Sequence, residues 1–298
     1  MQELWWFLGL MSGLVTAVYV FCNQQLKMPT AMFMVYRGVG LALVMLPFAV
    51  LFPFNPEWSF WGLCLLTGLL IAYNDNRFFN AVYNYGAEIS SALQPLCVGI
   101  TFFLWLVLQP SQIMVYWQNP LRFLLIMCCL AGFTLAILMI RRIPDNFSAL
   151  KFLLPSLFLI SIVDAFQKVI MRLGADNLPA ASFYYLMVTS FFAGLCNLIV
   201  FLRKEKNWRL IFLPRNLSLG FAVVSLAGIA VILKNFAMAG TPNPAYVAAL
   251  IFLSPVWIMA GNNIYFHFKK YIGYERINPY LLLLLLASVI GLVIFGRS

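Results

Sequence analysis

The chain has 298 residues, of which 63% are apolar and 9% are charged, whereas soluble domains average about 45–50% apolar and about 25% charged residues. This balance excludes a sizeable water-soluble domain. The formal net charge of +10 does not indicate nucleic-acid binding, because the basic residues lie in short gaps between apolar runs rather than on one soluble face.

Ten apolar runs of about 20 residues, the length that crosses a bilayer, follow one another along the chain. Proline, asparagine, glycine or charged residues bound each run. The first run lacks the basic segment of a secretory signal, so we expect it to be retained as a helix. The expected helices cover residues 3–24, 29–52, 58–82, 87–108, 119–140, 149–173, 180–202, 216–239, 243–266 and 279–296. The sequence therefore predicts an all-α integral membrane protein with ten transmembrane helices.

The two halves of the sequence resemble each other at a nearly constant offset of about 160 residues. The matching pairs are Pro95 with Pro255, Gly132 with Gly291 and, with a five-residue insertion in the second half, Asn80 with Asn235. Because each half holds an odd number of spans, the two copies must cross the membrane in opposite orientations. We therefore predict two inverted five-helix repeats, residues 1–142 and 149–298.

At this point the sequence resembles the drug/metabolite transporter superfamily, in its ten-helix EamA-like branch, over essentially the whole chain. The resemblance rests on Arg37 after Pro29, the alanine-rich approaches to Pro95 and Pro255, the glycine-centred fifth and tenth helices, and Lys168 late in the sixth helix. It implies a central cavity lined mainly by helices one, three, four, six, eight and nine. It also implies transport of small metabolites such as amino acids, sugar phosphates or nucleotide derivatives.

The distribution of basic residues predicts the orientation in the membrane. Of the 19 Lys and Arg residues, 12 lie on the side of the odd-numbered connections, three lie on the other side, and four lie within spans. The positive-inside rule therefore places the odd-numbered connections in the cytoplasm. One of them, residues 204–212, is amphipathic and basic. It either contacts anionic head groups or is a solvated loop that only fixes topology.

Ionisable side chains inside the spans indicate a functional site, because each costs about 2.5–3.5 kcal/mol to insert. The chain has four basic and two acidic residues of this kind, namely Arg37, Arg77, Lys168, Lys234, Asp75 and Asp164. The excess of positive charge favours a substrate with a carboxylate or phosphate, and a zwitterion also fits. Asp164 and Lys168 are four residues apart and can pair along one helix face. For Asp75, Arg37 or Lys234 is a better partner than Arg77.

These polar residues and two prolines are the candidate site. The substrate-binding candidates are Asp75, Asn76, Arg77, Asn80, Asp164, Gln167, Lys168, Lys234 and Asn235. Arg37 is a candidate for an ion pair that locks helices, and Pro95 and Pro255 are candidates for helix bending or gating. The alternative interpretation is that the polar groups serve internal pairing and helix packing. We expect no catalytic residue, metal or cofactor, because the six cysteines lie in apolar runs without C-x-x-C spacing and the chain has one histidine.

The function predicted from these features is secondary-active transport or exchange of a small anionic or zwitterionic metabolite by alternating access, in a bacterial inner membrane or its equivalent. Its expected partners are the small-molecule substrate, membrane lipid, and a proton or counter-substrate, with Asp75 or Asp164 as the proton carrier. No P-loop is present to drive transport by ATP. The alternatives are a multidrug-type exporter of cationic or aromatic compounds, a membrane-embedded enzyme, and a non-transporting scaffold.

Overall fold

The computed structural model describes residues 3–26, 30–85, 93–140, 147–204, 208–253, 256–257 and 279–296. Every regular element in these ranges is a helix, and none of the described residues forms a strand. The elements before residue 141 are α1 (Trp5–Leu26), α2 (Thr30–Val35), the π-helical segment η1 (Tyr36–Gly40), α3 (Leu41–Leu51), α4 (Trp58–Tyr85), the 3₁₀ segment η2 (Gln94–Leu96), α6 (Cys97–Leu108), α7 (Ser111–Gln118) and α8 (Pro120–Ile140).

The later elements are α9 (Phe147–Leu173), the 3₁₀ segment η3 (Ala175–Asn177), α10 (Leu178–Lys204), the 3₁₀ segment η4 (Trp208–Phe212), α11 (Pro214–Gly240), α12 (Pro244–Ile251) and α14 (Pro279–Gly296). The described part of the chain is therefore all-helical, as the apolar runs predict.

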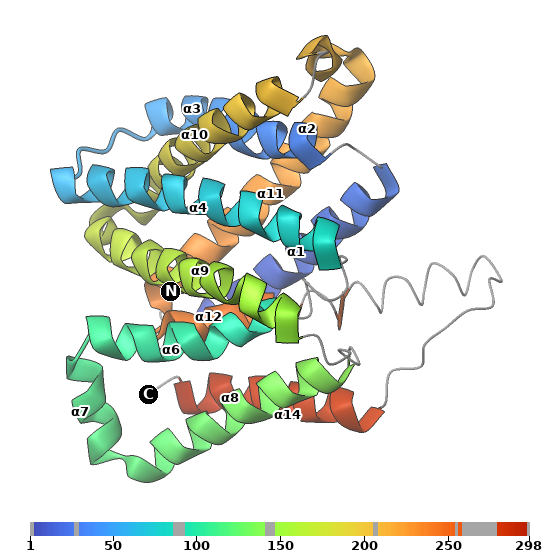
Figure 1. Ribbon diagram of the computed structural model, residues 1–298. Coiled ribbons are helices and arrows are strands. Elements are labelled where there is room, and N and C mark those ends of the chain that lie inside the picture. The colour runs from blue at the N-terminus through green and yellow to red at the C-terminus, as the bar shows by residue number, and fades with distance from the viewer. Residues whose placement is uncertain are drawn as a thin grey trace.

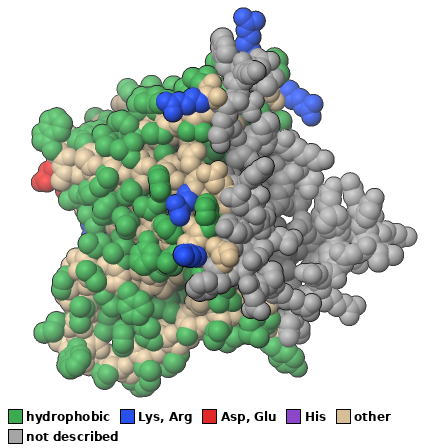
Figure 2. All heavy atoms as spheres, in the orientation of Figure 1, with side chains coloured by type: hydrophobic (Ala, Val, Ile, Leu, Met, Phe, Trp, Pro, Cys, Tyr) green, Lys and Arg blue, Asp and Glu red, His purple; other side chains and the backbone are tan. Residues whose placement is uncertain are grey.

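Several of these helices are long and apolar enough to cross a membrane. Within the described residues there are five, or six if the sharply bent pair α6 and α7 is one broken span. The five are Met32–Leu51, Pro120–Met139, Leu150–Leu173, Ala175–Arg203 and Pro214–Gly240. Apolar side chains also cover much of the described surface seen in Figure 2, where charged side chains are few. A surface of this kind is stable against lipid rather than water.

The structure adds one helix that the sequence analysis assigned to a connection. Residues Ser111–Gln118 form α7, which meets α6 at a bend of 107°. The cause is local, because Gln109 precedes Pro110 and takes a non-helical conformation, with φ −128° and ψ 74°. A residue before proline avoids helical geometry, whereas proline itself suits a helix start.

Two further expected helices are interrupted. The expected helix over 29–52 contains the π-helical turn η1 between α2 and α3. The expected helix over 243–266 stops at Ile251, and Phe252 and Leu253 lie in a turn. Pro255 has no N–H to bond the carbonyl of Ile251, four residues earlier, so a helix is weakened there. Pro255 itself lies outside the described residues.

Helices distant in the sequence pack side by side. α1 packs against α11 and α12, and α4 packs against α9 and α10. α8 and α14 lie together at the bottom of Figure 1, whereas α3 and α10 lie together at its top. At the crossing of η1 with α10, a Cβ on Gly38 would collide with the backbone of Gly194. These two glycines therefore allow the close approach that brings η1 against the bundle.

Candidate functional site

A polar cavity of about 180 Å³ lies among α2, η1, α3, α4, α9, α10 and α11. Its polar lining residues are Arg37, Asn74, Asp75, Asp164, Gln167, Tyr185, Thr189, Ser190, Asn197 and Lys234. Since polar groups are costly at bilayer depth, such a concentration within one cavity marks a candidate binding site.

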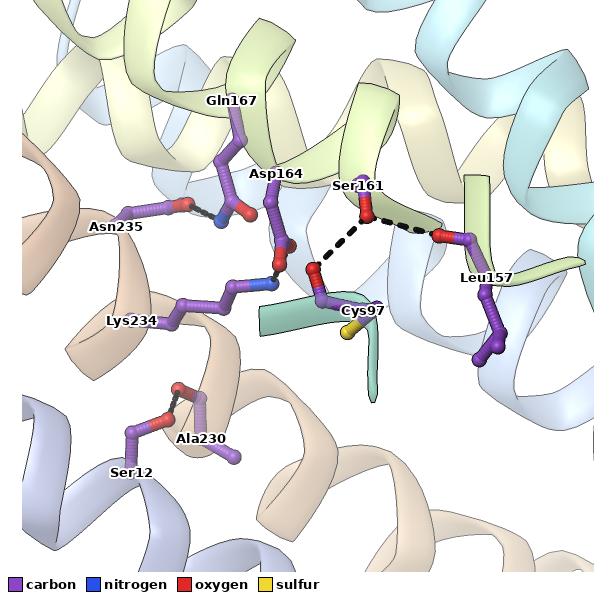
Figure 3. Close-up of polar contacts among 9 residues, drawn as sticks. All are labelled: Ser12, Cys97, Leu157, Ser161, Asp164, Gln167, Ala230, Lys234 and Asn235. Carbon is purple, nitrogen blue, oxygen red and sulfur yellow. Dashed lines mark hydrogen bonds and ion pairs between the residues drawn. The ribbon is translucent and has the colours of Figure 1, made fainter. Parts of the chain in front are cut away.

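The first ion pair in the cavity joins α9 to α11. Lys234 Nζ donates to Asp164 Oδ1 at 2.6 Å, and Figure 3 shows the lysine reaching across to the carboxylate. The Asp164 side chain is 4% exposed and that of Lys234 is 21% exposed. Asp164 lies about 4 Å from the middle of its apolar span, counted at 1.5 Å per residue. The pair is therefore deep in the bundle, and its lysine end faces the cavity.

The second ion pair joins η1 to α4. Arg37 Nη1 donates to Asp75 Oδ2 at 3.3 Å, which is one of the two partners that helix spacing favours for Asp75. The Arg37 side chain is 39% exposed and that of Asp75 is 13% exposed. Arg37 lies in the π-helical turn Tyr36–Gly40. An isolated π turn of this kind shifts the following side chains around the helix and occurs frequently at functional sites.

A buried amide network lies next to the first ion pair. Gln167 Nε2 donates to Asn235 Oδ1 at 2.5 Å, and Asn235 Nδ2 donates to Ser182 Oγ at 2.8 Å. Figure 3 shows Gln167 and Asn235 facing each other beside Asp164 and Lys234. Gln167 and Asn235 are both almost fully buried. The network links α9, α10 and α11 and holds the helices that carry the first ion pair.

A second set of hydrogen bonds holds α4 against its neighbours. Asn76 Nδ2 donates to Asn197 Oδ1 on α10 at 3.0 Å and to its own helix at Ala72 O at 2.8 Å. Ser156 Oγ on α9 donates to Asn74 Oδ1. These contacts orient the helix that carries Asp75.

Two predicted basic residues lie away from the cavity. Lys168 is 2% exposed, and its Nζ donates to the carbonyl oxygen of Ala239 at 3.0 Å. Arg77 donates from Nε and Nη2 to the carbonyl oxygen of Phe152 at 3.2 and 3.0 Å, and its guanidinium lies over the Phe152 ring. Both therefore bind helix backbone. Asp164 pairs with Lys234 rather than with Lys168, although Lys168 is four residues along the same helix.

This placement changes the charge of the site. The charged residues that line the cavity are two acids and two bases, not the two acids and four bases that counting within spans gives. The predicted positive excess is therefore wrong for the described cavity, and it no longer favours an anion over a zwitterion.

The remaining candidates among the described residues do not line the cavity. Asn235 and Asn76 support the cavity through the networks above, while Asn80 is exposed near the end of α4. Pro95 is buried in the 3₁₀ segment before α6, and Pro255 is outside the described residues. Among the described residues, no three His, Cys, Asp or Glu side chains converge to hold a metal ion.

None of the predicted site residues lies on α10, although this helix forms one wall of the cavity. Tyr185, Thr189, Ala193 and Asn197 all line the cavity. They recur every four residues, which places them along one helix face, and this spacing is a signal that a search for ionisable groups alone passes over. The described cavity also draws on the second and seventh expected helices, whereas the family resemblance implies the first, third, fourth, sixth, eighth and ninth.

Replacing Asn235 by alanine should lower the free energy of unfolding by about 1–3 kcal/mol, because Gln167 and Ser182 would lose their buried partner. Thermal unfolding of the detergent-purified protein measures this change. The matched control is Asn80→Ala, which alters an exposed asparagine and should leave the unfolding temperature nearly unchanged. Equal effects at the two positions would contradict the structural role of the Asn235 network.

The long apolar helices and the polar cavity enclosed between them define an α-helical membrane protein. Comparison of the chain with protein-family models and with curated proteins found no match.

Proposed function

We propose that this protein is a secondary-active transporter or exchanger that moves a small zwitterionic or anionic metabolite by alternating access. The observation that carries the proposal is a polar cavity at bilayer depth, bounded by the α2 to α3 segment and by α4, α9, α10 and α11, and lined by two ion pairs. An ion pair that only locked two helices together would not need to face a cavity. The architecture that we propose is ten spans in two inverted halves, 1–142 and 149–298, as in the drug/metabolite transporters that the sequence resembles.

The pattern of helix packing supports two related halves. We equate α1 with α9, the α2 to α3 segment with α10, α4 with α11, α6 with α12, and α8 with α14. When each helix is exchanged for its equivalent, the contact between α1 and α11 corresponds to a contact between α9 and α4. In the same way, the contact between α6 and α9 corresponds to a contact between α12 and α1. All four contacts occur, and α8 with α14 is a pair that maps onto itself. Inverted repeats produce this kind of reciprocity.

Two reciprocal contacts between α8 and α14 support the same correspondence. A Cβ on Gly132 would meet Ser288 Oγ, and a Cβ on Gly291 would meet Cys129 Sγ. Gly291 follows Gly132 by 159 residues, and Ser288 follows Cys129 by 159 residues. Each glycine therefore lies against a small side chain of the other helix, and these two side chains are at equivalent positions in the two halves.

The same offset relates the two halves of the site. Lys234 follows Asp75, and Asn235 follows Asn76, by 159 residues. This match needs no insertion, unlike the match of Asn80 with Asn235, and we propose it in place of that match. The equivalent positions then carry opposite charges, one in each ion pair.

The charge balance and size of the cavity favour a small zwitterion. A substrate with one ammonium and one carboxylate group can insert into one ion pair, with its carboxylate against the base and its ammonium against the acid, so no charge is left unpaired when it binds. A volume of about 180 Å³ is below the roughly 300–1,000 Å³ of pockets that enclose drug-sized ligands. Amino acids therefore fit this cavity better than nucleotide-like compounds do.

Thermal unfolding of the purified protein with amino acids, dicarboxylates, sugar phosphates, nucleotides, S-adenosylmethionine and cationic dyes tests the proposal. We expect an amino acid to stabilise the protein, by about 2.7 kcal/mol at a hundred times its dissociation constant. The Lys234→Met variant should lose this stabilisation, because it removes the ammonium group that pairs with the carboxylate of the ligand. Stabilisation by cationic dyes alone would instead indicate a multidrug exporter.

Flux of the stabilising ligand into vesicles separates transport from binding. A transporter moves the ligand across the bilayer, whereas a receptor or scaffold binds it without flux. Proton coupling through Asp75 or Asp164 predicts that an imposed pH gradient changes the rate. A rate that does not respond to the gradient would exclude proton coupling and favour exchange for a counter-substrate.

A further inference from the structure

A basic and apolar surface lies between α10 and α11, where the chain passes from one membrane-crossing helix to the next. We call it the basic rim and define it by five exposed residues, namely Arg203, Arg209, Phe212, Leu213 and Arg215. Phe212 is 61% exposed and Leu213 is 47% exposed. Arginines beside exposed apolar side chains are the combination that a protein presents to lipid head groups and the acyl boundary below them.

Contacts within the bundle show which other segments share this end. Gly68 of α4 lies against Thr189 of α10, and Asn76 lies against Asn197, so α4 and α10 run in the same direction. Arg77 reaches Phe152 near the start of α9. The rim is therefore at the same end of the bundle as the start of α9. The positive-inside rule assigns this end to the cytoplasmic leaflet, which is the anionic one.

One side chain connects the rim to the cavity. Tyr36 Oη donates to the carbonyl oxygen of Ile211 in η4 at 2.5 Å. The Tyr36 ring is buried and packs so closely on Gly220 of α11 that a Cβ there would lie 2.6 Å from it. Tyr36 is also the first residue of η1 and directly precedes Arg37. The position of η4 is thus fixed to the same turn that carries the arginine of the second ion pair.

We propose that the basic rim binds the phosphate of anionic phospholipids, and that this binding, transmitted by Tyr36, sets the position of Arg37 and hence the affinity of the cavity for its substrate. The second half of this inference rests on the proposed transport function. The first half does not. Positive charge at the rim is complementary to an anionic head group, and each basic residue near an anionic surface strengthens binding about fivefold.

Native mass spectrometry of the purified protein with phosphatidylglycerol or phosphatidylcholine tests the lipid site without any transport substrate. We expect the wild-type protein to retain phosphatidylglycerol preferentially. The double variant Arg203→Gln with Arg215→Gln should weaken this retention roughly 20-fold. The matched control is Lys151→Gln, which removes one exposed positive charge at the same end of the bundle but outside the rim and should weaken retention far less than the double variant does. Equal retention of the two lipids, or equal loss in the control, would show that the rim only fixes topology and would overturn the proposal.

The coupling is tested with Tyr36→Phe, which keeps the ring and removes only the hydrogen bond to Ile211. In nanodiscs, we expect wild-type affinity for the stabilising amino acid to be several-fold higher with phosphatidylglycerol than with phosphatidylcholine alone. Tyr36→Phe should still retain phosphatidylglycerol but bind the amino acid equally in both lipids. If the variant keeps the lipid dependence, the coupling is wrong. If no amino acid binds in either lipid, the transport proposal fails while lipid retention still reports on the rim.

Discussion

Replacing Asp164 by asparagine should lower the free energy of unfolding by about 2–5 kcal/mol. The variant leaves the ammonium group of Lys234 without its carboxylate, which lies 2.6 Å away in the native protein. Removal of one partner from a buried pair costs this much because the remaining charge stays desolvated and uncompensated. We expect the lower part of the range, since Lys234 is 21% exposed and retains contact with the cavity. Thermal and denaturant unfolding in a single detergent measure the change.

The double variant Asp164→Asn with Lys234→Met distinguishes the contribution of the ion pair to stability from the cost of leaving one charge without its partner. Removing both charges should recover most of the lost stability, because an apolar replacement of a buried ion pair is often neutral. The matched control is Asp176→Asn, since Asp176 is an exposed acid just beyond the end of α9. It should unfold like the wild-type protein. An Asp164→Asn variant as stable as the wild type would show that Lys234 does not depend on this carboxylate.

The same cycle distinguishes a binding site from a structural lock. If the pair only held α9 and α11 together, the double variant would regain stability and also keep ligand binding. In our proposal it regains stability but gains no stabilisation from an amino acid, because both groups that recognise the ligand are gone. Stability and ligand response therefore move in opposite directions in one protein.

The all-helical character and the long apolar helices of the described residues could be predicted from the sequence because they depend on local composition. An apolar run of about 20 residues can satisfy its backbone groups in lipid only as a helix. The sharp bend after Gln109 also has a local cause, since Pro110 follows it, although the expected helices leave this stretch as a connection. The π turn at Tyr36–Gly40 left no comparable signal. It accompanies the crossing of Gly38 and Gly194, which are far apart in the sequence.

The ion pairs show which contacts cannot be predicted from residue spacing along the chain. Asp75 pairs with Arg37, one of the two partners expected for it, because Arg77 is two residues away and points in another direction. Asp164 had a local candidate, Lys168, at the correct spacing, yet it pairs with Lys234 of another helix. Lys168 instead reaches the carbonyl oxygen of Ala239. The choice between two lysines depends on how α9 and α11 pack, and a single sequence does not contain that information in local form.

Substitution of Gly38 by alanine should have a larger effect than ordinary overpacking of a core, which costs about 1–3 kcal/mol. The added Cβ would collide with the backbone of Gly194, and backbone cannot move aside by changing rotamer. To relieve the clash, η1 must separate from α10, and Arg37 then leaves Asp75. We expect a sharp loss of monodisperse protein after detergent extraction and a lower unfolding temperature in the fraction that remains. Gly194→Ala should behave in the same way, because its Cβ would meet the backbone at Gly38 and Val39.

Two other glycines provide controls of the same chemical change. A Cβ on Gly62 of α4 or on Gly99 of α6 would meet nothing within 4 Å. Alanine at these positions should be neutral or should stabilise the helix by up to about 1 kcal/mol, because glycine is the poorer helix former. The four variants differ only in what surrounds the new methyl group. If Gly38→Ala unfolds at the same temperature as Gly62→Ala, the close crossing of η1 and α10 is wrong, and so is the placement of Arg37 that depends on it.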